Sequence, residues 1–238
     1  TKTTIKVRSL FYFLPQCYLV TCTMRVLIIT GGSSSERDIS LISAKNVETA
    51  LEANGHTVDV FDFKNGYLEL QKVLDAFDVI FPVMHGKEGE DGTLYRFLAS
   101  VDKHFVGSDS EGANTAFDKS LFKAYCDKTH IATAEWMAIN NNADIIKFGF
   151  PCVLKAANGG SSHEVALLFT EEDLSSEKVK HILTLKDTFF VEKHLQGIEI
   201  TVGVLIDEAL PVLEIISPTN GWFDYENKYS GASREIPF

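Results

Sequence analysis

The sequence predicts an α/β protein in which a parallel, Rossmann-like domain precedes a second, α+β domain. Short apolar runs alternate with amphipathic stretches from residue 24 to about residue 107, and β-rich segments dominate after residue 136. The 238 residues are 45% hydrophobic and 23% charged, which is an ordinary globular composition with enough length for a sizeable core. Disordered and fibrous classes are therefore excluded.

The first domain is predicted by a βαβαβα series. Such a series forms a parallel sheet with right-handed crossovers, and ligands bind beyond the carboxyl ends of its strands. The pair Asn54-Gly55 ends the first helix because both residues favour helix termination. In chain order we expect a strand at 25–30, a helix over 39–51, a strand at 57–61, a helix at 67–76, a strand at 78–83 and a helix from residue 92.

The second domain begins where the pattern changes, after residue 107. A long helical pattern comes first, and strands then surround one further helix. The asparagine run at 140–143 predicts a loop. We expect a helix at 111–128, strands at 152–156, 165–169, 189–194, 199–206 and 210–216, and a helix at 171–185.

Residues 1–23 are an extension of uncertain status. Basic residues precede an apolar run at 10–20, which superficially resembles a signal peptide. Pro15 and Gln16 interrupt that run, and no A-x-A-like cleavage site follows it. We therefore expect translated upstream sequence or a plain extension in preference to an export signal.

Charge and cysteine usage exclude several classes of partner. The 33 acidic and 22 basic residues give a net charge of −11, which argues against nucleic acid or an anionic membrane surface. No apolar run approaches the roughly 18 residues that a membrane span needs. The four cysteines lack CxxC spacing, and the histidines show no ligand pattern. We expect a cytoplasmic protein with no metal ligands among these residues.

Two segments at the expected ligand edge of the first sheet carry candidate chemistry. GGSSSE at 31–36 lets a ligand approach the backbone at a helix start, which favours anions, whereas Glu36 can instead hold an ammonium group. An ordinary βα turn with a serine cap accounts for the same residues. HGKEGEDG at 85–92 is rich in glycine and carboxylates, and a solvated loop is its alternative.

The second domain carries weaker signals. KAANGGSSH at 155–163 predicts a glycine-rich hairpin that can close over phosphates, with Lys155 supplying charge, or else a plain hairpin. Lys119 by itself predicts a solvated helical lysine. Glu192 beside Lys193 predicts an edge-strand ion pair, or acceptors for a ribose or an adenine edge.

Taken in order, the segments resemble the D-alanine–D-alanine ligase family of the ATP-grasp superfamily, from about Met24 to the C-terminus. Each motif alone is modest, but seven in the family's order make a specific match. The matching segments are GGSSSERDISL from 31, HGKEGEDG from 85, VGS from 106, DK from 118, Lys155 with GSS from 160, VEK from 191 with GIEITVGVL from 197, and DYENKY from 224.

The resemblance implies a fold with a pre-ATP-grasp domain followed by an α+β ATP-grasp domain. The implied divisions are an N-terminal substrate domain at 24–107, a central ATP-grasp subdomain at 108–191, and the start of a C-terminal subdomain at 192–238 that is incomplete. The implied enzyme uses ATP to join two D-alanines through an acyl phosphate, for peptidoglycan precursors. The family is commonly homodimeric.

The resemblance also implies roles for individual residues. Glu36 would hold the ammonium of the first D-alanine, and His85 would lie near that substrate. Ser161 and Tyr229 would join Glu36 in closing the loops over the substrates, with Lys228 beside them. The implied nucleotide-binding residues are Lys119, Lys155, Ser161, Ser162, Glu192, Lys193, Leu195 and Glu199.

The family's Mg²⁺ ligands follow the Lys-Tyr loop, so we expect them beyond Phe238 and expect negligible turnover from these residues alone. Ala156, Glu164 and Ile198 stand where the family usually has proline, glycine and arginine. Two alternatives stay open. One is a non-catalytic ATP-grasp-like module that binds nucleotide or D-alanine. The other is a D-alanine–D-lactate ligase, against which Tyr229 argues.

Overall fold

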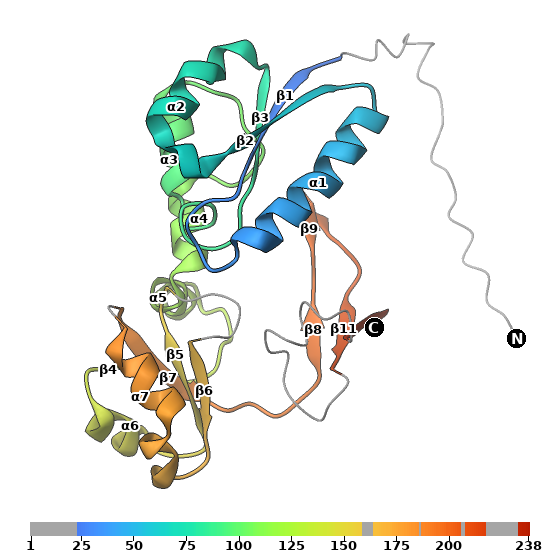
Figure 1. Ribbon diagram of the computed structural model, residues 1–238. Coiled ribbons are helices and arrows are strands. Elements are labelled where there is room, and N and C mark those ends of the chain that lie inside the picture. The colour runs from blue at the N-terminus through green and yellow to red at the C-terminus, as the bar shows by residue number, and fades with distance from the viewer. Residues whose placement is uncertain (1–22, 159–163, 186, 206–207, 218–232) are drawn as a thin grey trace, which may run out of the picture.

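The computed structural model describes residues 23–158, 164–185, 187–205, 208–217 and 233–238. A parallel sheet with helices on both faces comes first, and antiparallel sheets follow it along the chain (Figure 1). The predicted order of a Rossmann-like unit before an α+β unit is therefore confirmed. Among the described residues, no helix is both long enough and apolar enough to span a membrane.

The first sheet has the strand order β2-β1-β3, and all its strands run parallel. Each of the six predicted elements begins within two residues of its expected start. The fourth, a helix expected at 67–76, is an α-helix followed by a 3₁₀ turn, Leu74–Ala76. The elements are β1 (Arg25–Thr30), α1 (Arg37–Ala53), β2 (Thr57–Asp62), a 3₁₀ turn (Phe63–Asn65), α2 (Gly66–Val73), β3 (Val79–Val83) and α3 (Thr93–Ser100).

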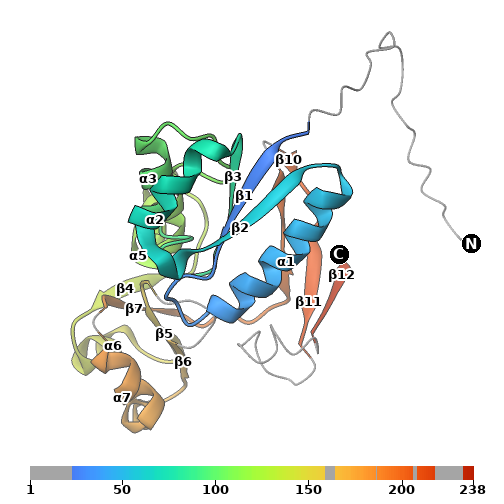
Figure 2. The same cartoon turned by 45° about the horizontal axis from the view of Figure 1, so that its top comes forward.

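Strand β1 is buried because helices cover both faces of the sheet (Figures 1 and 2). Its alternate residues serve the two faces, as the strand period requires. Leu27 and Ile29 join a core cluster with side chains from α2 and α3. On the other face α1 contacts all three strands and buries Ser40 and Ala44.

The helix predicted over 111–128 is wrong as a single element. The chain forms two helices, α4 (Ser110–Phe117) and α5 (Lys119–Thr129), which are separated by Asp118. Asp118 has an extended conformation with ψ 107°, and its side chain accepts hydrogen bonds from the amides of Ser120 and Leu121. An aspartate in this position starts a new helix, because its carboxylate satisfies amides that have no partner within the helix.

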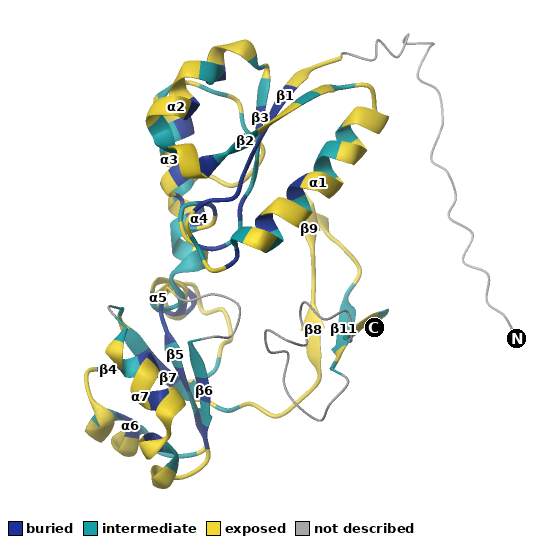
Figure 3. Cartoon of the chain, in the orientation of Figure 1, coloured by how far each residue is buried: buried dark blue, intermediate teal, exposed yellow. Residues whose placement is uncertain are grey.

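The central sheet is antiparallel with the strand order β4-β7-β5-β6. One face packs against α6 and α7, where Leu154, Val191, Ile145 and Ile182 are fully buried (Figure 3). The opposite face carries Lys155 and Glu192 and takes part in the candidate site. The elements are β4 (Trp136–Ile139), α6 (Asn142–Phe148), β5 (Cys152–Ala156), β6 (Val165–Leu168), α7 (Glu177–Thr184) and β7 (Phe189–Lys193).

Capping side chains explain two further corrections in this unit. The loop expected at 140–143 instead starts helix α6, because Asn141 and Asp144 form a reciprocal capping box. The helix expected at 171–185 is a 3₁₀ turn, Glu171–Ser175, followed by α7, and Ser176 caps the second piece. Asn141, in the predicted loop, and Ser176, inside the predicted helix, are each the residue that caps the start of a helix.

The last described part contains a sheet of order β12-β11-β8 and a hairpin of β9 and β10. The strand expected at 199–206 is interrupted at Val202 and Gly203, and the strand expected at 210–216 starts three residues late. Gly203 accepts a hydrogen bond from the Leu210 amide at 2.7 Å, which closes the hairpin. The elements are β8 (Glu199–Thr201), β9 (Val204–Leu205), β10 (Glu208–Ala209), β11 (Leu213–Ile216) and β12 (Arg234–Pro237).

Candidate active site

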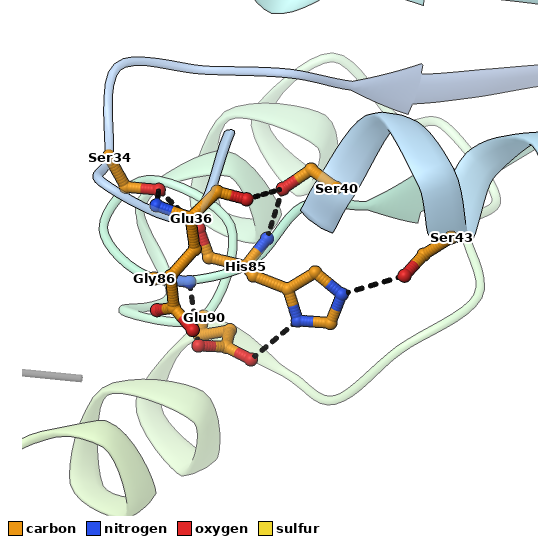
Figure 4. A network of polar contacts seen from close by, with 7 residues as sticks. All are labelled: Ser34, Glu36, Ser40, Ser43, His85, Gly86 and Glu90. Atoms are coloured by element: carbon orange, nitrogen blue, oxygen red, sulfur yellow. Dashed lines mark hydrogen bonds and ion pairs between the residues drawn. The ribbon is translucent and has the colours of Figure 1, made fainter. Parts of the chain in front are cut away.

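A polar network joins the two glycine-rich segments at the carboxyl ends of β1 and β3 (Figure 4). The Ser34 hydroxyl donates to the carbonyl of His85 at 2.7 Å. The Ser40 hydroxyl accepts from the His85 amide at 2.9 Å and donates to the carbonyl of Glu36 at 3.2 Å. The segments at 31–36 and 85–92 are therefore one structural unit, as their shared sheet edge predicts.

The imidazole of His85 lies between a hydroxyl and a carboxylate. Its Nε2 is 3.1 Å from Ser43 Oγ, and its Nδ1 is 3.7 Å from Glu90 Oε1. Glu90 is itself oriented by the Gly86 amide, which donates to Oε2 at 2.7 Å. The hydrogen bond to Glu90 raises the pKa of His85, and the charge of Glu36 adds to this effect. The site therefore favours a protonated, positively charged imidazole beside two carboxylates.

Glu36 is one of the few buried charged residues in the described part, with 7% of its surface exposed. Its side chain extends toward Gly86 (Figure 4). A Cβ added to Gly86, which has φ +77°, would lie 3.1 Å from Glu36 Oε2. The glycine thus leaves room for this carboxylate. A buried carboxylate is stable only beside cations or hydrogen-bond donors, so the position suits an ammonium group.

The glycine turn before Glu36 is fixed by an ion pair between Arg37 and Asp62, two residues that were not among the predicted site residues. Arg37 donates to both carboxylate oxygens of Asp62, at 2.9 and 2.6 Å, and also to the carbonyl of Gly32. These contacts hold the pKa of Asp62 well below its usual range. The two residues are 25 positions apart, so no local pattern could have paired them.

A cavity of about 730 Å³ lies against the open face of the central sheet. Its walls come from β5, β7, the segment that follows β7, and β11. The structure brings together here five of the residues expected to bind nucleotide, namely Lys155, Glu192, Lys193, Leu195 and Glu199.

Glu192 is the centre of a charge cluster beside this cavity. It forms ion pairs with Lys155 through Oε1 and with Lys123 through Oε2, the latter at 2.5 Å. Burial alone would raise the pKa of Glu192, but the charge of Lys155 and hydrogen bonds from both lysines hold it below its ordinary value. Lys123 was not identified from the sequence. Its only sequence signal is its place one helical turn after Lys119.

Lys119 is not the solvated helical lysine that its isolated position predicts. It is the first residue of α5, and both its backbone amide and its Nζ donate to the carbonyl of Ala157, at 3.0 and 3.3 Å. Burial lowers the pKa of Lys119, and the charge of Lys155 lowers it further. Two ammonium groups that repel each other in a half-buried place favour a bound anion.

Lys119 also connects the two halves of the site. It lines a second cavity, of about 480 Å³, together with Glu90 and Tyr95 from the first domain. Glu164 acts on the same lysine, since its negative charge raises the pKa that burial lowers. Glu164 Oε2 is buried and has no hydrogen-bond partner within the described chain. Glu164, which stands where the family usually has glycine, therefore lies close to Lys119.

Four expected site residues, Ser161, Ser162, Lys228 and Tyr229, lie outside the described residues. Within the ranges that the structure describes, no group of three or more histidine, cysteine, aspartate or glutamate side chains is placed to hold a metal ion.

Known proteins match the chain along most of its length. The family profile described as "D-ala D-ala ligase C-terminus" matches residues 126–238. A D-alanine–D-alanine ligase of Thermotoga petrophila is 35% identical over 217 residues, which are 90% of this chain and 71% of that protein. The crystal structure of the same enzyme from Bacillus anthracis aligns with a TM-score of 0.78 at 27% identity, over 91% of this chain and 72% of that chain. A second structure of the Bacillus anthracis enzyme, with ATP, aligns at 24% identity over 91% of this chain and 71% of that chain, and its TM-score of 0.76 supports the fold.

Proposed function

Because the chain belongs to the D-alanine–D-alanine ligase family, we propose that it serves the ATP-dependent joining of two D-alanines for peptidoglycan precursors. In this proposal the product forms through an acyl phosphate. The single observation that carries the proposal is the pairing of a cavity on the central sheet, lined by Lys155 and Lys193, with a buried carboxylate and a histidine on the first domain. A nucleotide and an amino acid need these two kinds of site.

The cavity against the central sheet suits ATP in size and chemistry. Its volume of about 730 Å³ lies in the usual range for small-molecule sites. Lys155 supplies positive charge for phosphates within this cavity, and Lys119, which lines the second cavity, supplies charge close to Lys155. Glu192 and Glu199 supply acceptors for the amino and hydroxyl groups of a nucleoside. Leu195, with 65% of its surface exposed, offers an apolar surface for a base.

The network in the first domain suits the first D-alanine. Glu36 would bind its ammonium group, and the His85 imidazole lies beside it to orient the carboxylate. By family resemblance, Ser161, Lys228 and Tyr229 would complete this end of the site. The second cavity, which Glu90 and Lys119 both line, supports a path for a phosphate between the two ends.

The reaction we propose has two displacement steps. A carboxylate oxygen of the first D-alanine attacks the γ-phosphorus of ATP, and ADP leaves. The amine of the second D-alanine then attacks the acyl carbon, inorganic phosphate leaves, and the amine loses a proton. The lysines would act by holding the phosphates in line and by neutralising charge, which is how phosphoryl transfer is mainly catalysed.

Mg²⁺ is expected from the family, and when bound it neutralises phosphate charge. The residues described by the structure do not offer a carboxylate cluster for it, so they do not fit a Mg²⁺ site by themselves. By family resemblance we also propose a homodimer in the cytoplasm. The two cysteines in the described part, Cys126 and Cys152, are unpaired and buried, which agrees with a reducing compartment.

Binding measurements on the full chain test the proposal without depending on turnover. Calorimetry should detect ATP binding, and Lys155→Met should weaken it by about tenfold to a hundredfold because a charge-assisted contact is lost. Lys128→Met, at an exposed position on the same helix as Lys119, is the matched control and should bind ATP normally. Absence of ATP binding by the unaltered chain would refute the proposal.

A non-catalytic binding module is the second candidate, and Glu164 favours it because a carboxylate near the lysine pair opposes phosphates. Phosphate release with Mg²⁺, with and without D-alanine, separates the two candidates. Release that depends on D-alanine supports the ligase, whereas binding of ATP and D-alanine without release supports the module. D-Lactate as second substrate tests the depsipeptide alternative in the same assay.

A further inference from the structure

Lys123 is a buried lysine to which the proposed chemistry assigns no role. It lies on α5 with its side chain only 8% exposed. Its ammonium group has three acceptors, namely Glu192 Oε2 at 2.5 Å, Thr133 Oγ1 at 2.6 Å and the Ala134 carbonyl at 3.2 Å. Three acceptors match the three protons of an ammonium group. The protein therefore holds this charge in a complete internal site.

Lys155 binds the other oxygen of the same carboxylate from a more exposed position. Its side chain is 27% exposed and lines the cavity of about 730 Å³. It pairs with Glu192 Oε1, whereas Lys123 pairs with Oε2. An anion that enters the cavity can compete for Lys155, but Lys123 remains enclosed by protein acceptors. Glu192 thus has one exchangeable partner and one fixed partner.

Building on the proposed ATP site, we propose that Lys123 is a positioning residue that keeps Glu192 in place when Lys155 exchanges it for a phosphate. Glu192 Oε1 is then available to accept a hydrogen bond from the amino group of adenine. Guanine carries a carbonyl oxygen at the corresponding position, which the carboxylate repels. Lys123 therefore sets nucleotide affinity and base preference through Glu192, without contacting the nucleotide.

The need for a fixed partner follows from burial. The Glu192 side chain is only 13% exposed, and a buried carboxylate that loses its cations is strongly destabilised. If Lys123 were absent, release of Lys155 would leave Glu192 without a cation. Lys155 would then stay paired with Glu192. Nucleotide binding would have to break this ion pair with no second cation to stabilise the buried carboxylate.

Lys123→Met removes the charge and retains most of the side-chain length. On the full chain, calorimetry should show ATP binding weakened about tenfold or more, and the preference for ATP over GTP reduced. D-Alanine binding should be unchanged, since Lys123 lies away from the first-domain network. Lys128→Met, on the same helix but exposed, should behave as the unaltered chain does. Should Lys123→Met not fold, Lys123→Gln retains two donors without the charge and supports the same comparison.

A double-variant comparison distinguishes positioning from a general structural role. In a Glu192→Gln background the buried carboxylate that Lys123 holds in place is absent, so adding Lys123→Met should change ATP affinity little. An equal loss in both backgrounds, or ATP affinity that Lys123→Met leaves unchanged, would overturn the inference. Failure of the unaltered chain to bind ATP would instead overturn the proposed function and this inference with it.

Discussion

Gly92 fixes how the segment at 85–92 lies against α4, and replacing it by alanine tests that packing. Gly92 has φ +82°, and a Cβ built on it would lie 2.1 Å from the carbonyl oxygen of Ser110. Ser110 is the first residue of α4, whose amides are capped by Asp109. The oxygen therefore cannot move away unless the start of that helix moves too.

The expected loss of stability has two parts. A non-glycine residue in the left-handed region costs about 1–2 kcal/mol, and overpacking against backbone costs about 1–3 kcal/mol more. Gly92→Ala should therefore cost about 3 kcal/mol, which for a chain of this size lowers the melting temperature by roughly 6–12 °C. Gly55 has φ +85° with no atom within 4 Å of an added Cβ, so Gly55→Ala isolates the conformational part.

Thermal unfolding followed by circular dichroism measures both variants against the unaltered chain. Gly55→Ala should lower the melting temperature by only about 2–8 °C. The change in unfolded-state entropy is the same for both substitutions, so it cancels from the comparison. Equal shifts for the two variants would refute the reasoning, because they would show that the contact with Ser110 adds nothing to the cost.

Three further predictions concern other contacts. Glu90 raises the pKa of His85 above its ordinary value of 6.5. The stabilisation from this pair is therefore fully present below pH 6.5 and is lost as the pH rises through the raised pKa. Glu90→Gln should flatten the pH dependence of the melting temperature. Leu154→Ala, at a fully buried position, should lower the free energy of unfolding in urea titrations by about 2–5 kcal/mol. Asn141→Ala should lower the same free energy by about 1 kcal/mol, and no change would show that the capping box contributes nothing.

Hydrophobic periodicity predicted the first domain well because both faces of its sheet are covered. A strand such as β1, buried on both sides, appears in the sequence as an unbroken apolar run, and its helices show clear amphipathic spacing. The glycine segments at 31–36 and 85–92 were also predicted to lie at one edge of the sheet, because the carboxyl ends of parallel strands lie together. Turn chemistry and topology were sufficient for this part of the site.

The sequence could not predict contacts that depend on helix capping or on partners far apart in the chain. Asp118 lies within a helical pattern and Asn141 within an asparagine run that predicts a loop, and only the three-dimensional structure shows that both residues start helices. The ion pair of Lys123 with Glu192 joins residues 69 positions apart (192 minus 123) across a helix and a sheet. For the same reason Lys119 by itself looked like an ordinary solvated lysine.

The interruption at Asp118 has a mechanical consequence. Helix α4 packs against α3 of the first domain, whereas α5 is attached to the central sheet through Lys119 and Lys123. Rotation about the backbone of Asp118 would therefore move one body against the other and leave the lysines in register with the sheet. A single aspartate between two helices is thus the point at which the chain passes from packing on the first domain to packing on the central sheet.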